Sequence, residues 1–277
     1  MNPIPRSALL AVDDLVGDLF EVLLRRGVLS KTFVLYSSDH GYKLGQWRIG
    51  TSKQHPYESD IRVPFFISGP GVTPGANYTR QISGNVDLLP TMLELAAGAP
   101  FVEAVNPDGR SMAPFLVHGV SATTDAPAWR DHFLNEYYAV GTYFNDHSPC
   151  WQDGHKTADQ CGGSMPTGPA GHVDKCVESA GVGDGLCYFV DSTHSNSWRQ
   201  LRILNATHNL NYVEYDPAWT WIVTDSTGAG LQHYELYDIS SDPYQVKNVY
   251  PATPNATRAA LHAMLVNYYN CSGMSCP

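Results

Sequence analysis

Apolar residues recur at three- and four-residue spacing in several segments, and each pattern predicts an amphipathic helix. The first covers residues 7–26, where Arg25 and Arg26 suit the negative helix end and Gly27 offers a stop. A second covers 86–97, with Ser83 or Asn85 as its cap, and the last covers 256–269. These helices leave room for strands between them.

Short apolar runs at 32–37 and 63–68 predict two strands. The run at 32–37 has no polar alternation, as expected of a strand covered on both faces in a parallel sheet. Helix followed by buried strand indicates an α/β region, part of a mixed, mostly parallel sheet with flanking helices. We expect this region to cover residues 1–118.

The pattern changes after about residue 119, where short strand-like runs are separated by long loops. They lie at 133–138, 198–204, 219–223 and 234–238. The stretch 150–187 is rich in Gly and Cys and shows no periodicity, so we expect a disulfide-tied loop there. We therefore expect a small antiparallel α+β region over 119–277, with the boundary near 118–130.

Composition narrows the classes of partner. The 277 residues are 43% hydrophobic, enough for a core, and carry a net charge of −10 without a Lys/Arg cluster. This argues against nucleic acid and against an anionic membrane surface. No apolar run reaches the length of a membrane span, so none is expected.

Six cysteines and four N-x-[S/T] sequons, at Asn77, Asn205, Asn255 and Asn270, indicate a glycoprotein from an oxidising compartment. No C-x₂-C pair is present, which argues against zinc. The close spacing of Cys271 and Cys276 suggests one disulfide, with the four cysteines of 150–187 pairing among themselves. We expect a secreted or lysosomal protein, although its first residues lack a signal-peptide layout; this mismatch suggests a missing upstream segment.

The stretch after the 32–37 strand carries the candidate chemistry. Asp39 and His40 stand where ligands bind in open α/β sheets, beyond the carboxyl end of a strand. A carboxylate and an imidazole can bind a divalent cation together, and Lys53 offers a positive charge for an anionic oxygen. The alternative is an ordinary turn in which Asp39 caps local amides, with Lys53 a solvated surface residue.

Several motifs occur in order between about residues 7 and 250. They are AVDDLV from Ala11, YSSDHGYKLGQ from Tyr36, KQHPYESDIRVP from Lys53, VDLLPT from Val86, DGRS from Asp108, ELYD from Glu235 and DPYQ from Asp242. As a set they resemble the sulfatase family of the alkaline-phosphatase-like superfamily. Within it, the chain is most similar to N-acetylglucosamine-6-sulfatases, and only to their C-terminal half.

The resemblance implies a sulfuric ester hydrolase acting on sulfated sugars or glycosaminoglycans. It places Asp39 and His40 in a calcium site and Lys53 against the sulfate group. Glu58 and Arg62 would form a local ion pair and Gln46 would be scaffold. Lys43 is expected to face solvent, with substrate contact as the alternative.

Family members convert the Cys or Ser of a C/S-x-P-x-R motif to formylglycine, the nucleophile. No Cys or Ser here has Pro at +2 and Arg at +4. We expect a fragment, inactive alone, whose partner is the missing N-terminal half of the same protein with its formylglycine and first metal ligands. The alternative is a non-catalytic remnant that binds sulfated glycans. A related phosphoesterase is disfavoured, because such enzymes tend to use two zinc ions with more His and Asp ligands.

Overall fold

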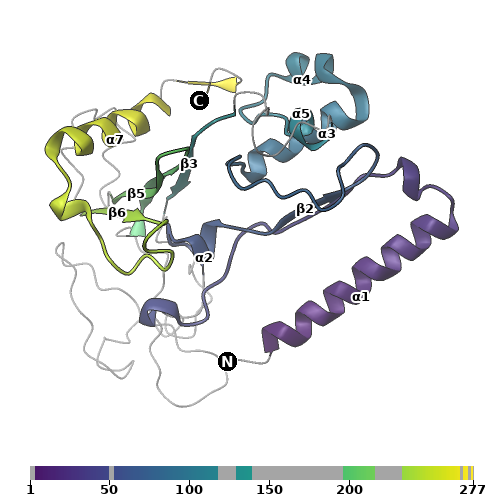
Figure 1. The fold of residues 1–277 in the computed structure, drawn as a ribbon, viewed down its shortest axis with the longest axis horizontal. Helices are drawn as coiled ribbons and strands as arrows, with labels where there is room; N and C mark the ends of the chain where they lie inside the picture. Colours follow the sequence, from purple (N-terminus) through teal and green to yellow (C-terminus); the bar gives the residue numbers. More distant parts are fainter. Residues whose placement is uncertain are drawn as a thin grey trace, which may run out of the picture.

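The computed structural model describes residues 4–49, 53–117, 129–138, 196–215, 233–268, 271–273 and 276. The first predicted helix is confirmed as α1 (Ile4–Arg25), which lies apart from the other elements (Figure 1). Its apolar positions are largely in solvent, with Leu15 67% and Leu24 65% exposed. Amphipathic helices gain most of their stability from burying that face, so α1 has an apolar side that the described residues do not cover. No helix in the described ranges is long and apolar enough to cross a membrane.

Strands β1 (Val34–Ser37) and β2 (Phe65–Ser68) confirm the two predicted strands of the first region. They pair antiparallel, with Val34 opposite Ser68. The expectation of a mostly parallel sheet is therefore not confirmed, because neither described sheet has a parallel pair. In β2 half-buried and exposed residues alternate, and Phe66 is 66% exposed, which is typical of an antiparallel strand with one open face. An apolar run in the sequence does not specify the direction of its neighbour.

Three helices follow β2: α3 (Leu88–Ala97), α4 (Ala99–Val105) and α5 (Ala113–Leu116). The predicted caps Ser83 and Asn85 are wrong. A 3₁₀ turn, Asn85–Asp87, precedes α3, and the Asp87 carboxylate accepts the Gly84 N–H at 2.9 Å. Helix α4 was not predicted. It begins directly after Gly98 with Pro100 in its first turn, where proline is tolerated because the N–H it lacks has no partner within a helix.

The second sheet consists of β3 (His132–Tyr137), β4 (Trp198–Leu204), β5 (Asn209–Tyr215) and β6 (His233–Asp238). The strands lie in the order β3-β4-β5-β6, and every neighbouring pair is antiparallel. This confirms the predicted antiparallel region, although β5 was missed because polar residues interrupt its apolar pattern. The predicted strand 219–223 and loop 150–187 lie outside the described residues, as do residues 118–128 at the expected domain boundary.

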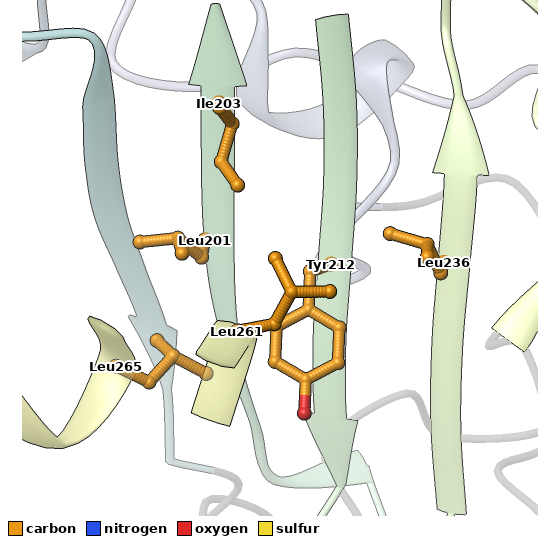
Figure 2. Close-up of a cluster of buried hydrophobic side chains, with 6 residues drawn as sticks. All are labelled: Leu201, Ile203, Tyr212, Leu236, Leu261 and Leu265. Carbon is orange, nitrogen blue, oxygen red and sulfur yellow. The ribbon is translucent and has the colours of Figure 1, made fainter. Parts of the chain in front are cut away.

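Helix α7 (Asn255–Tyr268) confirms the last predicted helix and packs on this sheet (Figure 1). Leu261 and Leu265 of α7 meet side chains of β4, β5 and β6 in a buried cluster (Figure 2). The cluster residues from the strands are Leu201, Ile203, Tyr212 and Leu236. The apolar face of α7 is therefore buried, in contrast to that of α1.

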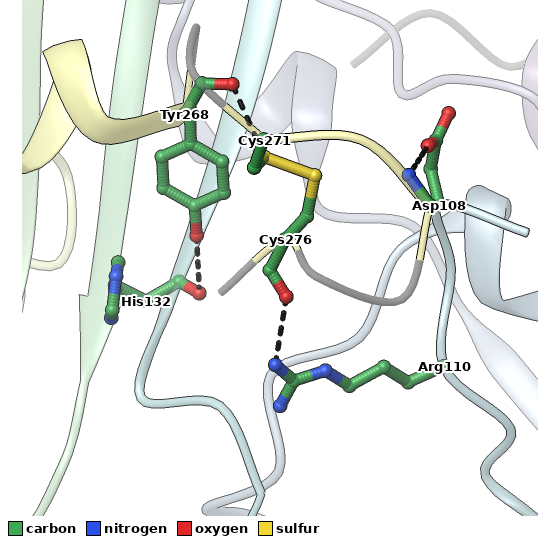
Figure 3. Close-up of a disulfide and its surroundings, with 7 residues drawn as sticks. Asp108, Arg110, His132, Tyr268, Cys271 and Cys276 are labelled. Atoms are coloured by element: carbon green, nitrogen blue, oxygen red, sulfur yellow. Dashed lines mark hydrogen bonds between the residues drawn. A yellow bond between two sulfur atoms is a disulfide. The ribbon is translucent and has the colours of Figure 1, made fainter.

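The predicted disulfide between Cys271 and Cys276 is confirmed, with an S–S distance of 2.12 Å (Figure 3). The segment closed by this disulfide contacts the turn at Asp108. The Gly273 N–H donates to Asp108 Oδ1 at 2.6 Å, and the Arg110 side chain donates to the Cys276 carbonyl at 2.8 Å. The two hydrogen bonds therefore attach the segment after α7 to the loop between α4 and α5, and the disulfide closes that segment into a small ring.

Candidate active site

The candidate site begins where β1 ends. After Ser37 the chain leaves the sheet, and Ser38 Oγ donates to the His40 carbonyl at 2.8 Å. The Asn85 side chain donates to the Ser38 carbonyl at 3.1 Å, which links this turn to the start of α3. These bonds present Asp39 and His40 at the strand's carboxyl end, where sequence reasoning placed them.

Gly41 allows the chain to double back on itself at the site. Its N–H donates to the Asp60 carbonyl at 2.7 Å, and a Cβ at position 41 would lie 1.8 Å from the Ser59 carbonyl oxygen. No side chain fits there. The glycine of the SDHG motif therefore serves close packing between the turn and the start of α2 (Glu58–Ile61).

Lys43 corrects a sequence-based expectation. Its side chain faces neither solvent nor a substrate but is fully buried. The ammonium lies 2.8 Å from Asp60 Oδ2 and 2.8 Å from His55 Nδ1. A buried charge needs a partner, and the carboxylate of Asp60 stabilises the Lys43 ammonium in this buried position. The sequence does not show that these two residues are in contact.

His40 and Lys53, thirteen residues apart, are brought together. The His40 Nδ1 contacts the Gly41 carbonyl at 2.7 Å, and since a carbonyl only accepts, Nδ1 carries the hydrogen. The lone pair therefore sits on Nε2, which receives a hydrogen bond from the Lys53 ammonium. The imidazole is thus set in the tautomer that a cation ligand requires, by a hydrogen bond of the kind that orients metal-bound histidines.

Asp39 completes the arrangement with its exposed carboxylate. Asp39 Oδ2 lies 3.2 Å from His40 Nε2, and Asp39 Oδ1 accepts the His40 N–H at 3.0 Å. The local capping that the alternative reading foresaw is therefore present as well. Two acceptors at 3.2 Å repel each other unless a positive charge lies nearby, and the Lys53 ammonium supplies one.

Asp39 and His40 fit two positions of a divalent-cation site, since one offers an oxygen and the other an oriented lone pair. Calcium takes about six to eight ligands, mostly oxygens. Within the described ranges, no group of three or more His, Cys, Asp or Glu side chains could hold a metal ion. The donor set here is therefore compatible with part of a calcium site and insufficient for a whole one.

The predicted ion pair of Glu58 with Arg62 is weak. The two charges are 3.5 Å apart, and the Arg62 side chain is 76% exposed. A stronger partner comes from β4, where Arg202 Nε donates to Glu58 Oε1 at 2.8 Å. Gln245 of the DPYQ motif accepts the Glu58 N–H at 2.7 Å. Glu58 therefore joins the loop after Lys53 to the second sheet.

The VDLLPT and DGRS motifs meet at the buried Asp87. Asp87 Oδ1 accepts a hydrogen bond from Arg130 at 2.6 Å and the Arg110 N–H at 2.7 Å. A Cβ on Gly109 would lie 2.1 Å from the Val86 carbonyl oxygen, so the DGRS turn packs directly on the turn before α3. These motifs build the scaffold beside the candidate site.

Sequence reasoning missed the side chains that hold the segment after Lys53. Asn196, Trp198 and Asn211 donate to the carbonyls of residues 54 and 56. They lie more than 140 residues away in the chain. Asn211, a polar residue inside the otherwise buried strand β5, was the one of the three that the sequence pattern could have indicated.

Comparisons with known proteins address the fold and the family. Residues 7–99 match the family model described as Sulfatase. An N-acetylglucosamine-6-sulfatase of Capra hircus is 28% identical over 270 residues, covering 98% of this chain and 40% of that protein. This chain therefore spans about two-fifths of the length of that relative.

Solved structures show which known fold this chain resembles. A protein in complex with its substrate D-glucosamine-2-N,6-O-disulfate has a TM-score of 0.56 at 22% identity, over 94% of this chain and 37% of that one. A phosphonate monoester hydrolase of Agrobacterium radiobacter has a TM-score of 0.54 at 19% identity, over 92% and 38%. At such identities the likeness concerns the fold alone.

The chain therefore shares the fold of the solved structures it matches. The predicted resemblance to the sulfatase family is confirmed, and the similarity to N-acetylglucosamine-6-sulfatases extends over 98% of the chain.

Proposed function

We propose that this chain forms part of a sulfuric ester hydrolase that acts on sulfated sugars. The observation that carries the proposal is the convergence of His40 and Lys53, with Asp39 on the same imidazole. The relative of similar sequence is an N-acetylglucosamine-6-sulfatase, and one structural neighbour was solved with a disulfated glucosamine. Both support a sulfated amino sugar as the substrate class.

Lys53 would bind the sulfate group. Its ammonium is a compact charge with three donors, and His40 Nε2 occupies one of them. Once His40 Nε2 binds calcium instead, all three donors can reach anionic oxygens of the ester and stabilise the charge that develops on them during hydrolysis.

Asp39 and His40 would contribute two ligands to a calcium ion. His40 Nε2 would then exchange the Lys53 ammonium for the ion, because its one lone pair cannot bind both. The ion, when bound, would supply positive charge for the sulfate oxygens. The protein's own contribution is orientation: the Gly41 carbonyl holds the imidazole in one tautomer, and the Asn85 side chain holds the backbone of the turn. We propose that the other ligands and the formylglycine nucleophile come from a segment outside these 277 residues.

We further propose that the whole protein is secreted or lysosomal. The Cys271–Cys276 disulfide and the exposed sequons at Asn77 and Asn255 suit an oxidising compartment. The open apolar side of α1 and the chain's two-fifths share of its relative support a larger catalytic domain that includes this chain.

The test has two stages. An antibody against this chain should detect, in cells or medium, a native polypeptide much longer than 277 residues. That polypeptide should release sulfate from glucosamine 6-sulfate in a calcium-dependent reaction. Lys53→Met should lower kcat/KM at least about a hundredfold, the usual cost of removing a group that stabilises transition-state charge.

Lys31→Met is the matched control, because Lys31 is an exposed lysine on the 3₁₀ turn before β1. It should keep full activity. A full-length protein that hydrolyses no sulfate ester, or one that tolerates Lys53→Met, would refute the proposal.

A further inference from the structure

The segment that follows Lys53 is held by side chains of the second sheet. The carbonyl of Gln54 accepts two hydrogen bonds at 2.9 Å, one from Asn196 Nδ2 and one from Trp198 Nε1. Trp198 is buried at the start of β4, where its ring stacks on Tyr137 of β3. The packing of the Trp198 ring within the second sheet therefore fixes the position of its Nε1 donor.

Gln54 adopts a backbone conformation that needs such support. Its φ is 99°, in a region that residues with a Cβ rarely enter. A conformation of this kind persists only when its surroundings over-determine it, and such residues gather at functional sites. Here the two hydrogen bonds to the Gln54 carbonyl stabilise this conformation. Gln54 directly follows Lys53, whose side chain contacts His40.

A row of hydrogen-bonded side-chain amides holds a second carbonyl of this loop, that of Pro56. Asn135 of β3 donates to Gln200 Oε1 at 2.7 Å, and Gln200 of β4 donates to Asn211 Oδ1 at 2.9 Å. Asn211 of β5 then donates to the Pro56 carbonyl at 2.7 Å. Gln200 and Asn211 are fully buried, so each amide is oriented by the one before it. The row crosses three strands and ends on the loop of Lys53.

We propose that Asn196 and Trp198 are positioning residues for Lys53. Their hydrogen bonds to the Gln54 carbonyl hold the backbone next to Lys53, and so place the Lys53 side chain beside His40. The inference rests on the proposed function for its catalytic meaning, because Lys53 is there the sulfate-binding group. The amide row that ends at Pro56 holds the same loop two residues further along. The second sheet thus sets the geometry of a site whose chemical groups all lie in the first region.

The test measures the reactivity of Lys53 without any turnover. The chain is labelled with a trace of acetic anhydride, and acetylation of each lysine is followed by peptide mass spectrometry. Trp198→Phe keeps the ring and removes the Nε1 donor. We expect Lys53 to be acetylated about fivefold faster in this variant, the change that the net free energy of one hydrogen bond produces. The exposed Lys31 and Lys247 serve as references and should not change.

Trp129→Phe is the matched control, because Trp129 Nε1 also donates to a backbone carbonyl, that of Ile82, at 2.6 Å. It removes the same kind of bond away from the Lys53 loop and should leave Lys53 unchanged. Unchanged Lys53 acetylation in Trp198→Phe, or an equal rise in Trp129→Phe, would overturn the proposal. If Trp198→Phe also makes the fully buried Lys43 reactive, it has lost the fold, and Asn196→Ala decides by the same criterion.

Activity of the longer native protein separates this inference from the proposed function. Trp198→Phe should lower kcat/KM for the sulfate ester about fivefold, and Trp129→Phe should leave it unchanged. Altered acetylation of Lys53 in a protein without sulfatase activity would uphold the positioning role and refute the function. An unchanged rate of Lys53 acetylation in Trp198→Phe, in a protein with sulfatase activity, would refute the positioning role and uphold the function.

Discussion

The ammonium of Lys43 lies 2.8 Å from the carboxylate of Asp60, and both side chains are shielded from water. His55 shares the site through its ring nitrogen and through its backbone N–H, which donates to the same Asp60 oxygen at 2.9 Å. This buried pair closes the loop that carries Lys53. Lys43, the lysine of the YSSDHGYKLGQ motif, is therefore a structural residue.

Lys43→Met should destabilise the chain by about 3–5 kcal/mol, because it leaves Asp60 buried without its charge partner. The free energy of unfolding from urea titration measures this loss. Lys247→Met, at an exposed lysine, should change stability by less than about 0.5 kcal/mol. Equal stability of the two variants would mean that the Lys43–Asp60 pair contributes nothing net.

Acid should destabilise the second sheet through Glu214. Burial opposes the ionisation of Glu214, but the hydrogen bond from His262 and the charge of Arg199 outweigh it and lower the pKa of Glu214 below its ordinary 4.5. Because the pKa is lower in the folded state, this stabilisation is complete above pH 4.5 and is lost as the pH falls through the folded value. Unfolding free energies measured from pH 7 to pH 3 should therefore decline on the acid side.

Glu214→Gln should flatten this acid decline and cost about 3–5 kcal/mol at pH 7, because Arg199 is then buried without its countercharge. Glu103→Gln, at an exposed position of α4, should keep the wild-type pH profile. An unchanged acid decline in Glu214→Gln would assign the pH dependence to other carboxylates.

Removing the terminal disulfide should cost about 2 kcal/mol, the magnitude expected for a short closed loop. The double variant Cys271→Ser/Cys276→Ser leaves the other four cysteines intact, so it is compared with the wild type under non-reducing conditions. Urea titration gives the difference in stability. Limited proteolysis should cleave the chain after α7 faster, because the Gly273 and Cys276 contacts with Asp108 and Arg110 depend on the bridge.

Glycosylation should differ among the sequons. Asn77 and Asn255 are exposed and should carry glycans when the protein passes through a secretory pathway. The Asn205 amide instead donates to Asp131 at 3.3 Å, and its oxygen accepts the N–H groups of Thr207 and His208. We expect lower occupancy there. Glycopeptide mass spectrometry checks the order, and full occupancy at Asn205 would contradict it.

Much of the local structure follows from sequence patterns. Helices α1, α3 and α7 and strand β4 were predicted to within a few residues, because their periodicity or apolar runs are local properties. The five-residue spacing of Cys271 and Cys276 likewise predicted their bridge. The ordered motifs around His40 and Lys53 predicted the family.

Long-range contacts were beyond the sequence. The burial of Lys43 depends on Asp60, and the hold on Gln54 depends on Trp198, 144 residues away. The antiparallel direction of β2 depends on how the chain returns through the loop after His40. The sequence alone thus determined which residues bear the candidate chemistry. The tertiary structure decided which of them meet, because a hydrogen bond or ion pair forms only where folding brings distant groups within about 3 Å.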